Sequence, residues 1–320
     1  MRSLTIGSLV LLSVSLCSAQ TLLPATAPAL VGAGFANPFP IAVAPGQLLT
    51  LFVQSNTGSD GVSATFWNGS ADEAMPVLAV SQANAACTGS SNTACANLLA
   101  VTVQIPFDAP AIAAPGSNIA VVPSSIAVAV NGVKSSYFGV QPAPNQVHIL
   151  TACDVIVGGS PSFQAIRGLG CAPLITHADG RQVSAILPAK SGEELVAYAT
   201  GLGQTNPPLT TGQPAAQSSP TVAAFNLDFN YRANALATAP GAVGATVAAP
   251  LFTGATKGFT SLYQINFIVP PPPAGTYPCV DFAVPALSSS GSAVQSNLTV
   301  SVGSNFSFDG GGICVTPSGN

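Results

Sequence analysis

Residues 262–275, "LYQINFIVPPPPAG", combine the pattern of a β-strand with an abrupt stop. Apolar and polar side chains alternate from Tyr263 to Val269, and this period of two is typical of a half-buried antiparallel strand. Four prolines follow directly, and proline cannot donate a hydrogen bond to a strand ladder. The prolines therefore end the strand and carry the chain in extended form to the next one. We expect the alternate side chains Tyr263, Ile265, Phe267 and Val269 to face a core.

The composition of the whole chain favours an all-β fold. Charged residues make up 6% of the sequence, against roughly 25% in ordinary soluble domains, and helix surfaces are usually built from Glu, Lys and Arg. Short alternating runs are separated by turn clusters such as "NPFP" and "SSSGSA". This pattern predicts immunoglobulin-like β-sandwiches, with a small barrel as the structural alternative. The seven Lys and Arg residues are scattered and the net charge is −4, which argues against a nucleic-acid partner.

Two stretches of the sequence recur in the same order. Residues 45–53, "PGQLLTLFV", resemble 191–199, "SGEELVAYA", and residues 101–110, "VTVQIPFDAP", resemble 261–270, "SLYQINFIVP". The second match pairs Gln104 with Gln264, Phe107 with Phe267 and Pro110 with Pro270. We therefore predict two copies of one module in tandem.

The predicted organisation of the chain follows from this repeat. Residues 1–19 show the n-, h- and c-regions of a secretory signal with cleavage after Ala19, so we expect a secreted or periplasmic protein with no transmembrane segment after cleavage. The predicted segments are 20–147 for the first β-sandwich module, 148–171 for a disulfide-closed connector, 172–303 for the second module and 304–320 for a tail tethered by Cys314.

The cysteines indicate disulfides. Removing Cys17 with the signal leaves six of the seven cysteines, an even count that suits an exported chain. A zinc site is the rival interpretation, but no pair has the C-x₂₋₄-C spacing that such a site uses. Pairing of sequence neighbours predicts Cys87–Cys95, Cys153–Cys171 and Cys279–Cys314, and other connectivities stay open.

Three longer stretches carry a resemblance to a known family. They are "APGQLLTLFV" (44–53), "THADGRQVSAILPAKSGEELVAYATGLGQTNPP" (176–208) and "LYQINFIVPPPPAGTYP" (262–278). They resemble the uncharacterised domain found, usually near the C-terminus, in many secreted proteins of Solibacter and related acidobacteria. The resemblance covers most of residues 172–303, whereas the first copy has "QIPFDAP" in place of a "QINFxVP" type sequence. It implies a secreted immunoglobulin-like module with no established enzymatic activity and no catalytic residues to transfer.

No catalytic constellation is evident in the sequence. His148 and His177 are the only histidines, and no G-x-S-x-G elbow accompanies them; we interpret both as structural. The acidic pairs at 72–73 and 193–194 are sequence neighbours, which point to opposite faces of a strand, whereas a glycosidase needs two carboxylates facing each other. Asp309 alone offers too few oxygen ligands to bind calcium. We expect no enzyme activity, no metal and no cofactor.

Trp67 is the single tryptophan and the one candidate for ligand binding. It fills a core in one interpretation, and in the other it stacks on a sugar ring or anchors a protein partner. Asn68, Asn297 and Asn305 fit the N-x-[ST] motif, but the bacterial resemblance removes its usual meaning.

The sequence therefore favours an exported, non-catalytic binding or structural protein, an adhesion or spacer protein of the bacterial cell envelope or extracellular space. Its partner would be an unidentified protein or polysaccharide. A carbohydrate-binding module protein is the alternative, and a small secreted hydrolase is a remote third hypothesis.

Overall fold

The computed structural model describes residues 27–33, 41–56, 58–82, 97–109, 124–151, 154, 172–231, 245–273, 279, 293–303, 305–307 and 311–317. Several sequence predictions concern residues outside these ranges: the signal with cleavage after Ala19, the pairs Cys87–Cys95 and Cys153–Cys171, and Asp309.

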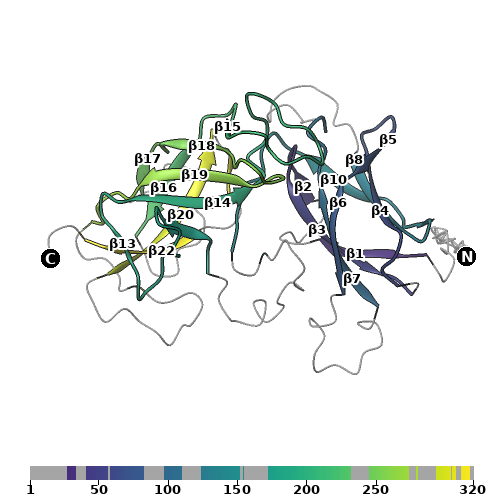
Figure 1. The fold of residues 1–320 in the computed structure, drawn as a ribbon, viewed down its shortest axis with the longest axis horizontal. Coiled ribbons are helices and arrows are strands. Elements are labelled where there is room, and N and C mark those ends of the chain that lie inside the picture. The colour runs from purple at the N-terminus through teal and green to yellow at the C-terminus, as the bar shows by residue number, and fades with distance from the viewer. Residues whose placement is uncertain are drawn as a thin grey trace, which may run out of the picture.

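The first module is a sandwich of two sheets (Figure 1). One sheet has the order β1 (Ala29–Ala33), β3 (Leu48–Gln54), β7 (Leu98–Gln104) and β6 (Val77–Gln82). The other has the order β2 (Ile41–Val43), β10 (Phe138–Pro142), β8 (Ser124–Val130), β4 (Val62–Trp67) and β5 (Asp72–Met75), with β9 (Val133–Lys134) paired to β8.

The second module repeats this plan. One sheet has the order β11 (His148–Ile149), β14 (Glu194–Thr200), β19 (Tyr263–Ile268), β18 (Phe252–Ala255) and β15 (Ser219–Pro220), with β12 (Ile175–His177) also paired to β14. The other has the order β13 (Ala189–Lys190), β22 (Gly311–Thr316), β20 (Val294–Val302), β16 (Asn226–Asn230) and β17 (Thr246–Ala248), with β21 (Asn305–Phe306) paired to β20. The described chain is thus all-β, with two immunoglobulin-like sandwiches in tandem.

Each sandwich encloses its own apolar core, and the predicted face of β19 lies in the second one. Tyr263, Ile265, Phe267 and Val269 are all fully buried, as the alternation predicts. The ring of Phe267 lies 5.7 Å from that of Phe229 on the opposite sheet. Full burial of an apolar side chain of this size stabilises the fold by roughly 1.5–3 kcal/mol, so this strand is a major contributor to the second core.

Strand register defines how the two copies correspond. Leu49 of β3 pairs with Val103, and Leu195, its counterpart in β14, pairs with Phe267. Val103 therefore corresponds to Phe267, an offset of 164 residues (267 minus 103), and the predicted pairing of Phe107 with Phe267 is wrong by four residues. An even shift leaves the alternation of faces unchanged, which is why the sequence pattern did not detect it. The correct counterpart of Pro270 is Pro106 rather than Pro110.

A buried serine occurs at the same place in both copies. The backbone N–H of Val128 donates to Oγ of Ser135 at 3.1 Å, and Ser135 N–H donates to the Val128 carbonyl at 2.8 Å. Val300 and Ser307 make the same two contacts at 3.1 and 2.7 Å. Because the arrangement recurs after β8 and after β20, it belongs to the fold of the module.

The predicted connector at 148–171 begins with the first strand of the second module, β11, which lies at the edge of its sheet. β11 and β12 pair with successive parts of β14, Ile149 with Ala199 and Ile175 with Ala197. The chain leaves this edge strand after Leu150 and returns at Leu174, whose N–H donates to the Leu150 carbonyl at 2.6 Å. The chain on either side of this break therefore forms one divided edge strand along β14.

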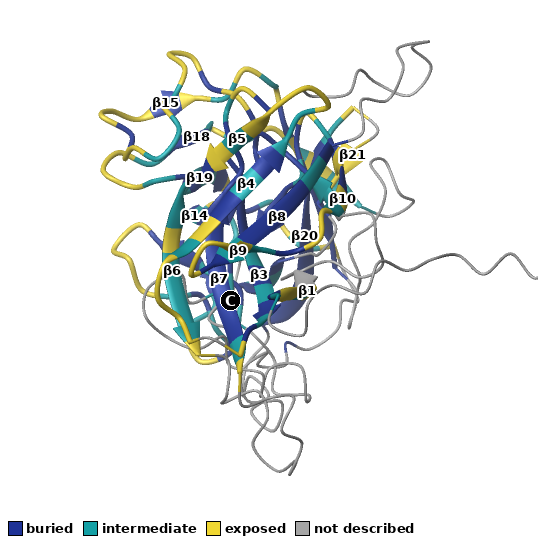
Figure 2. Cartoon of the chain, turned by 90° about the vertical axis from the view of Figure 1, so that its right-hand side faces the viewer, coloured by how far each residue is buried: buried dark blue, intermediate teal, exposed yellow. Residues whose placement is uncertain are grey.

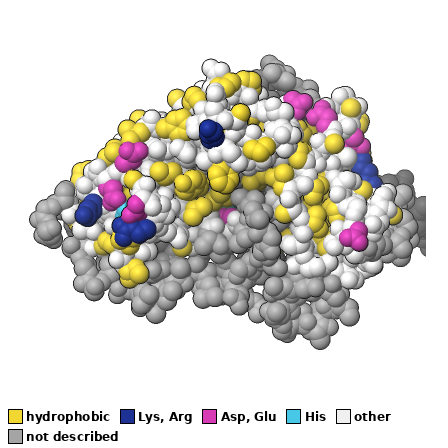
Figure 3. All heavy atoms as spheres, viewed as in Figure 1, with side chains coloured by type: hydrophobic (Ala, Val, Ile, Leu, Met, Phe, Trp, Pro, Cys, Tyr) yellow, Lys and Arg dark blue, Asp and Glu magenta, His cyan; other side chains and the backbone are white. Residues whose placement is uncertain are grey.

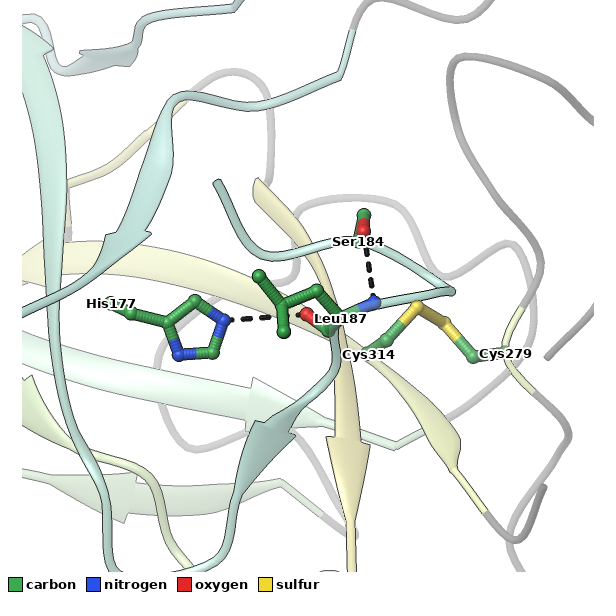
Figure 4. Close-up of a disulfide and its surroundings, with 5 residues drawn as sticks. All are labelled: His177, Ser184, Leu187, Cys279 and Cys314. Atoms are coloured by element: carbon green, nitrogen blue, oxygen red, sulfur yellow. Dashed lines mark hydrogen bonds between the residues drawn. A yellow bond between two sulfur atoms is a disulfide. The ribbon is translucent and has the colours of Figure 1, made fainter. Parts of the chain in front are cut away.

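The prediction of a tail at 304–320 is wrong, because β22 lies inside a sheet between β13 and β20. Its alternate residues Ile313 and Val315 are buried in the second core. The sequence pattern did not predict this strand, because "GGICVT" begins with two glycines and glycine is depleted in β-strands. The predicted disulfide Cys279–Cys314 is present, with its Cα atoms 5.5 Å apart, and it fastens β22 (Figure 4).

The two modules meet in a junction made by polar contacts. Gln104, at the end of β7, is fully buried; its Oε1 accepts a hydrogen bond from Gly212 N–H at 2.5 Å, and its Nε2 donates to Oγ of Ser261. Leu48 N–H donates to Oγ1 of Thr200 at 3.0 Å, and Phe107 N–H donates to Oγ1 of Thr211 at 3.0 Å.

The linker between the modules is also fixed by a contact with the second module. Gln146 N–H donates to the Gly201 carbonyl at 2.8 Å, and a Cβ added at Gly201 would lie 2.0 Å from the Gln146 carbonyl oxygen. Gly201 also has a φ of 76°, a conformation that favours glycine. The sandwiches are therefore fixed end to end by the linker and by the junction around Gln104.

Candidate functional site

The β4–β5 hairpin brings Trp67 and Asp72 together. Its turn, "NGSA", is organised by Asn68, whose Oδ1 accepts hydrogen bonds from the N–H groups of Ser70 and Ala71, both at 3.0 Å. Gly69 supplies a φ of 93°. As a result Asp72 lies directly opposite Trp67 in the strand pairing. The N-x-[ST] motif at Asn68 is thus explained by turn chemistry.

Trp67 and Asp72 lie on the outer face of their sheet. Phe66 is buried in the core of the first module, and its neighbour Trp67 is half-buried on the opposite side of the strand. Strand pairing places Ser125 of β8 beside Trp67 and Gly139 of β10 beside Ser125, so these residues form one row across the outer face. Figure 2 looks onto this face, with β5, β4, β8 and β10 side by side.

Tyr137 lies across this face. It directly precedes β10, and β8 and β4 lie between β10 and β5 in the sheet. Its hydroxyl nevertheless donates to the carboxylate of Asp72, with oxygen distances of 2.8 and 3.0 Å. The central strand β8 carries only small side chains on this face, and Ala127 there is 1% exposed, which leaves room for the ring to lie over the sheet.

Lys134 completes the cluster. Its Nζ donates to Asp72 Oδ2 at 2.5 Å and to the Tyr137 hydroxyl at 2.7 Å, and it lies 4.4 Å from the centre of the Tyr137 ring. The rings of Trp67 and Tyr137 meet edge to face, with centres 6.5 Å apart and planes at 61°. Hydrogen bonds from Lys134 and Tyr137 lower the pKa of Asp72, and the hydrogen bond to Asp72 raises the pKa of Lys134. The two charges therefore offset each other.

The residue types in this cluster are rare in the first module. Residues 20–147 contain one tryptophan, one tyrosine, one lysine and no arginine. All three side chains, Trp67, Lys134 and Tyr137, meet around Asp72. We call these four residues the Trp67 cluster.

The Trp67 cluster belongs to one copy of the module only. Phe66 pairs with Ile126 as Phe229 pairs with Leu298, so Trp67, the next residue, corresponds to Asn230. In the same way Lys134, paired with Ala129, corresponds to Phe306, paired with Ser301. The fold of the module does not require the cluster, in contrast to the serine that recurs in both copies.

The histidines predicted to be structural are both buried. His148 is 2% exposed, and its Nε2 lies 2.9 Å from Oδ2 of Asp154, which also accepts a hydrogen bond from Thr151 N–H at 2.6 Å. Asp154 thereby holds the turn after β11. The imidazole ring of His148 is therefore enclosed by protein.

His177 links three segments of the second module. Its Nδ1 lies 2.6 Å from Oε1 of Glu193, and its Nε2 lies 3.3 Å from the Leu187 carbonyl, beside the disulfide (Figure 4). Burial raises the pKa of Glu193, but hydrogen bonds from His177 and from Lys190 N–H outweigh this effect and lower it. The adjacent Glu194 instead contacts Asn266 at 3.3 Å, so the two carboxylates point apart, as the alternation of faces predicts.

Within the described ranges, no three His, Cys, Asp or Glu side chains gather in a way that could hold a metal ion. Nor does any described segment form a helix long and apolar enough to span a bilayer. Figure 3 shows how few charged side chains appear on one face of the molecule.

Comparison with known proteins adds little to this description. No protein-family model matches the chain, and a search of curated proteins gave no match. Among solved structures the chain is similar to one described as "Structures of Clostridium thermocellum CbhA fibronectin(III)-like modules", with 8% sequence identity and a TM-score of 0.18, over 89% of this chain and 94% of that chain. The strand order of the two sandwiches shows the immunoglobulin-like fold independently of this similarity.

Sequence reasoning singled out Trp67 but missed its three partners. In the sequence Asp72 stood out only as one of two neighbouring acids, and no motif marked Lys134 or Tyr137. A count of rare residue types in each copy would have drawn attention to both, because each occurs once in residues 20–147.

Proposed function

We propose that this chain is an exported, non-catalytic binding protein of the bacterial cell envelope or extracellular space. The observation that carries the proposal is the Trp67 cluster, a half-exposed group of two aromatic rings and an ion pair that one copy of the module has and the other lacks. A fold requirement would be present in both copies. Export is supported by the signal pattern and by the resemblance to secreted acidobacterial domains.

A second function, that of a spacer, is favoured by the junction. The hydrogen bonds of Gln104 and the close contact of the linker with Gly201 fix the two sandwiches end to end. The second module would therefore hold the first at a set distance and orientation from an attachment point. Binding and spacing are compatible roles for one protein.

The binding function is tested with full-length mature protein carrying a fluorescent label. We expect it to be retained on cell envelopes of the producing bacterium, and Tyr137→Ala to reduce that retention. Phe306→Ala removes an exposed ring from the other copy and is the matched control. Equal retention of wild type and Tyr137→Ala would contradict a role for this surface.

Export and the absence of catalysis need separate measurements. N-terminal sequencing of the mature chain is expected to begin at Gln20. Turnover of an ester, peptide or glycoside that disappears in His148→Ala or His177→Ala would overturn the non-catalytic part of the proposal.

A further inference from the structure

We propose that the Trp67 cluster binds an uncharged polysaccharide, with sugar rings stacked on Tyr137 and Trp67 and sugar hydroxyls bound by Asp72 and Lys134. This inference rests on the proposed binding function and names the chemical class of its ligand.

The aromatic rings supply the first part of the argument. Tyr137 is 50% exposed even though its hydroxyl is tied to Asp72, so the ring is held in place while much of its surface meets solvent. Trp67 lies beside it at an angle of 61°. A pyranose ring presents a face of C–H groups with partial positive charge, and the negative face of an aromatic ring attracts such groups. A ring fixed beforehand loses little conformational freedom on binding.

The ion pair supplies the second part. The side chains of Asp72 and Lys134 are 35% and 36% exposed, with Oδ2 and Nζ 2.5 Å apart. Two adjacent sugar hydroxyls can donate to such a carboxylate and accept from such an ammonium group, since a hydroxyl does both. Hydrogen bonds to charged groups are the stronger ones, so the pair can direct a ligand whose stacking alone is not selective.

The charge balance favours an uncharged ligand. Residues 20–147 contain the acids Asp60, Asp72, Glu73 and Asp108, and Lys134 is their only cation. The charge of Lys134 is already offset by Asp72 at hydrogen-bond distance. A polyanion such as a uronic-acid chain would approach a net negative module with no free cation to pair with.

The surroundings of the cluster favour a glycan over a protein partner. The row that contains Trp67 continues through Ser125 to Gly139, whose Cβ position would contact nothing within 4 Å. Among the other large apolar side chains described as exposed in this module, Val31 and Leu78 belong to the other sheet. Val133 pairs with the core-facing Val130 and so lies on the side of the sheet opposite Trp67. Protein interfaces bury roughly 800 Å² per partner around apolar anchors, whereas a sugar chain needs one or two rings and nearby hydrogen-bonding groups.

The sole tryptophan of the chain makes the test direct, because the emission of Trp67 reports this site alone. Full-length mature protein is titrated with four uncharged polysaccharides (soluble xylan, glucomannan, mixed-linkage β-glucan and amylose) and with polygalacturonate as the anionic arm. We expect saturable changes in Trp67 emission with at least one uncharged polymer, and none with polygalacturonate.

Variants separate binding from folding. Tyr137→Ala is expected to weaken binding about tenfold or more, which corresponds to about 1.4 kcal/mol. Tyr137→Phe keeps the ring and is expected to retain most of the affinity, and Asp72→Asn is expected to weaken it while leaving stacking possible. Phe306→Ala is the control for removal of an exposed ring elsewhere and is expected to bind as wild type does. Unfolding midpoints of all variants show whether each remains folded.

The outcomes distinguish this inference from the proposed function. If no uncharged polymer changes the emission but envelope retention still depends on Tyr137, the inference is overturned and the binding function stands with a protein partner. Preferential binding of polygalacturonate also overturns it. If neither emission nor retention depends on the cluster, both proposals fail for this surface.

Discussion

Gln104 and Gly212 are 108 residues apart in the sequence, yet the side-chain oxygen of Gln104 accepts the Gly212 N–H at 2.5 Å across the junction. The amide nitrogen of the same side chain donates to Oγ of Ser261, which has an unusual φ of 58° for a residue other than glycine. A single buried amide is thus satisfied by two loops of the other module, and this contact couples the two sandwiches.

Replacement of Gln104 by alanine should therefore loosen the junction between the modules. The change leaves the Gly212 N–H and the Ser261 hydroxyl without these partners, and an unsatisfied buried polar group costs about 1–3 kcal/mol. We expect a lower free energy of unfolding by denaturant and a broader distance distribution in small-angle scattering. Gln264→Ala, which alters a half-buried amide on β19, is the control. Two superimposable scattering profiles for wild type and Gln104→Ala would show that the junction does not depend on this side chain.

The serines that recur in both copies should be equally important to each. Ser135→Ala and Ser307→Ala each remove a hydroxyl that accepts from a backbone N–H at 3.1 Å. We expect each to lower stability by about 1–2 kcal/mol, because the Val128 or Val300 N–H loses its acceptor. Hydrogen exchange should localise the two effects, with faster exchange at Val128 in one variant and at Val300 in the other. Unaltered exchange at both positions would be inconsistent with this role.

The disulfide should stabilise the second module. Cys279 and Cys314 are 35 residues apart, and closing a loop of that size contributes roughly 3–4 kcal/mol in the chain-entropy model. We expect the double variant Cys279→Ser, Cys314→Ser to unfold at lower denaturant concentration. Because β22 is a member of its sheet, the folded variant should keep its strand content by circular dichroism; loss of that content in water would mean that the disulfide alone holds β22.

The pair His177 and Glu193 should make stability depend on pH in acid. The pKa of Glu193 is lowered in the folded state, so its contribution is fully present above the unfolded value of about 4.3 and is lost as pH falls through the folded value. Between about pH 5 and pH 3 the free energy of unfolding of Glu193→Gln should fall less steeply than that of wild type. Glu194→Gln alters an exposed contact with Asn266. In this control the free energy of unfolding should depend on pH as steeply as in wild type.

The carboxyl of Asp72 should titrate below its ordinary pKa of about 3.9. Hydrogen bonds from Lys134 and then from Tyr137 cause the lowering, so Lys134→Met should return the pKa furthest toward the ordinary value and Tyr137→Phe part of the way. Carbon-detected NMR of the Asp72 carboxyl measures this shift. Phe306→Ala should leave the titration unchanged, and a normal pKa in wild type would show that the cluster is open in solution.

The core could be predicted from the sequence because alternation reports burial directly. Tyr263, Ile265 and Phe267 are buried as the period of two requires. The alignment of the copies failed for the same reason, since a shift of four residues preserves the alternation. The pairings of Leu49 with Val103 and of Leu195 with Phe267 reveal it. β22 escaped prediction because its glycines weaken the strand signal.

The candidate site could not be assembled from the sequence because it depends on strand order. Trp67 and Asp72 are five residues apart on one hairpin, but Tyr137 and Lys134 enter from the other side of β8. That Tyr137 lies across β8 also requires small side chains there, as at Ala127. Neither relationship is visible in any single stretch of the chain.

The divided edge strand has a practical consequence for protein engineering. Ile149 and Ile175 occupy neighbouring places along β14, although 26 positions separate them (175 minus 149). The pairing with β14 is thus continuous across this place, although the chain itself is interrupted there. Foreign peptides could be displayed between residues 151 and 173, far along the chain from Trp67, and the second sandwich would serve as their carrier.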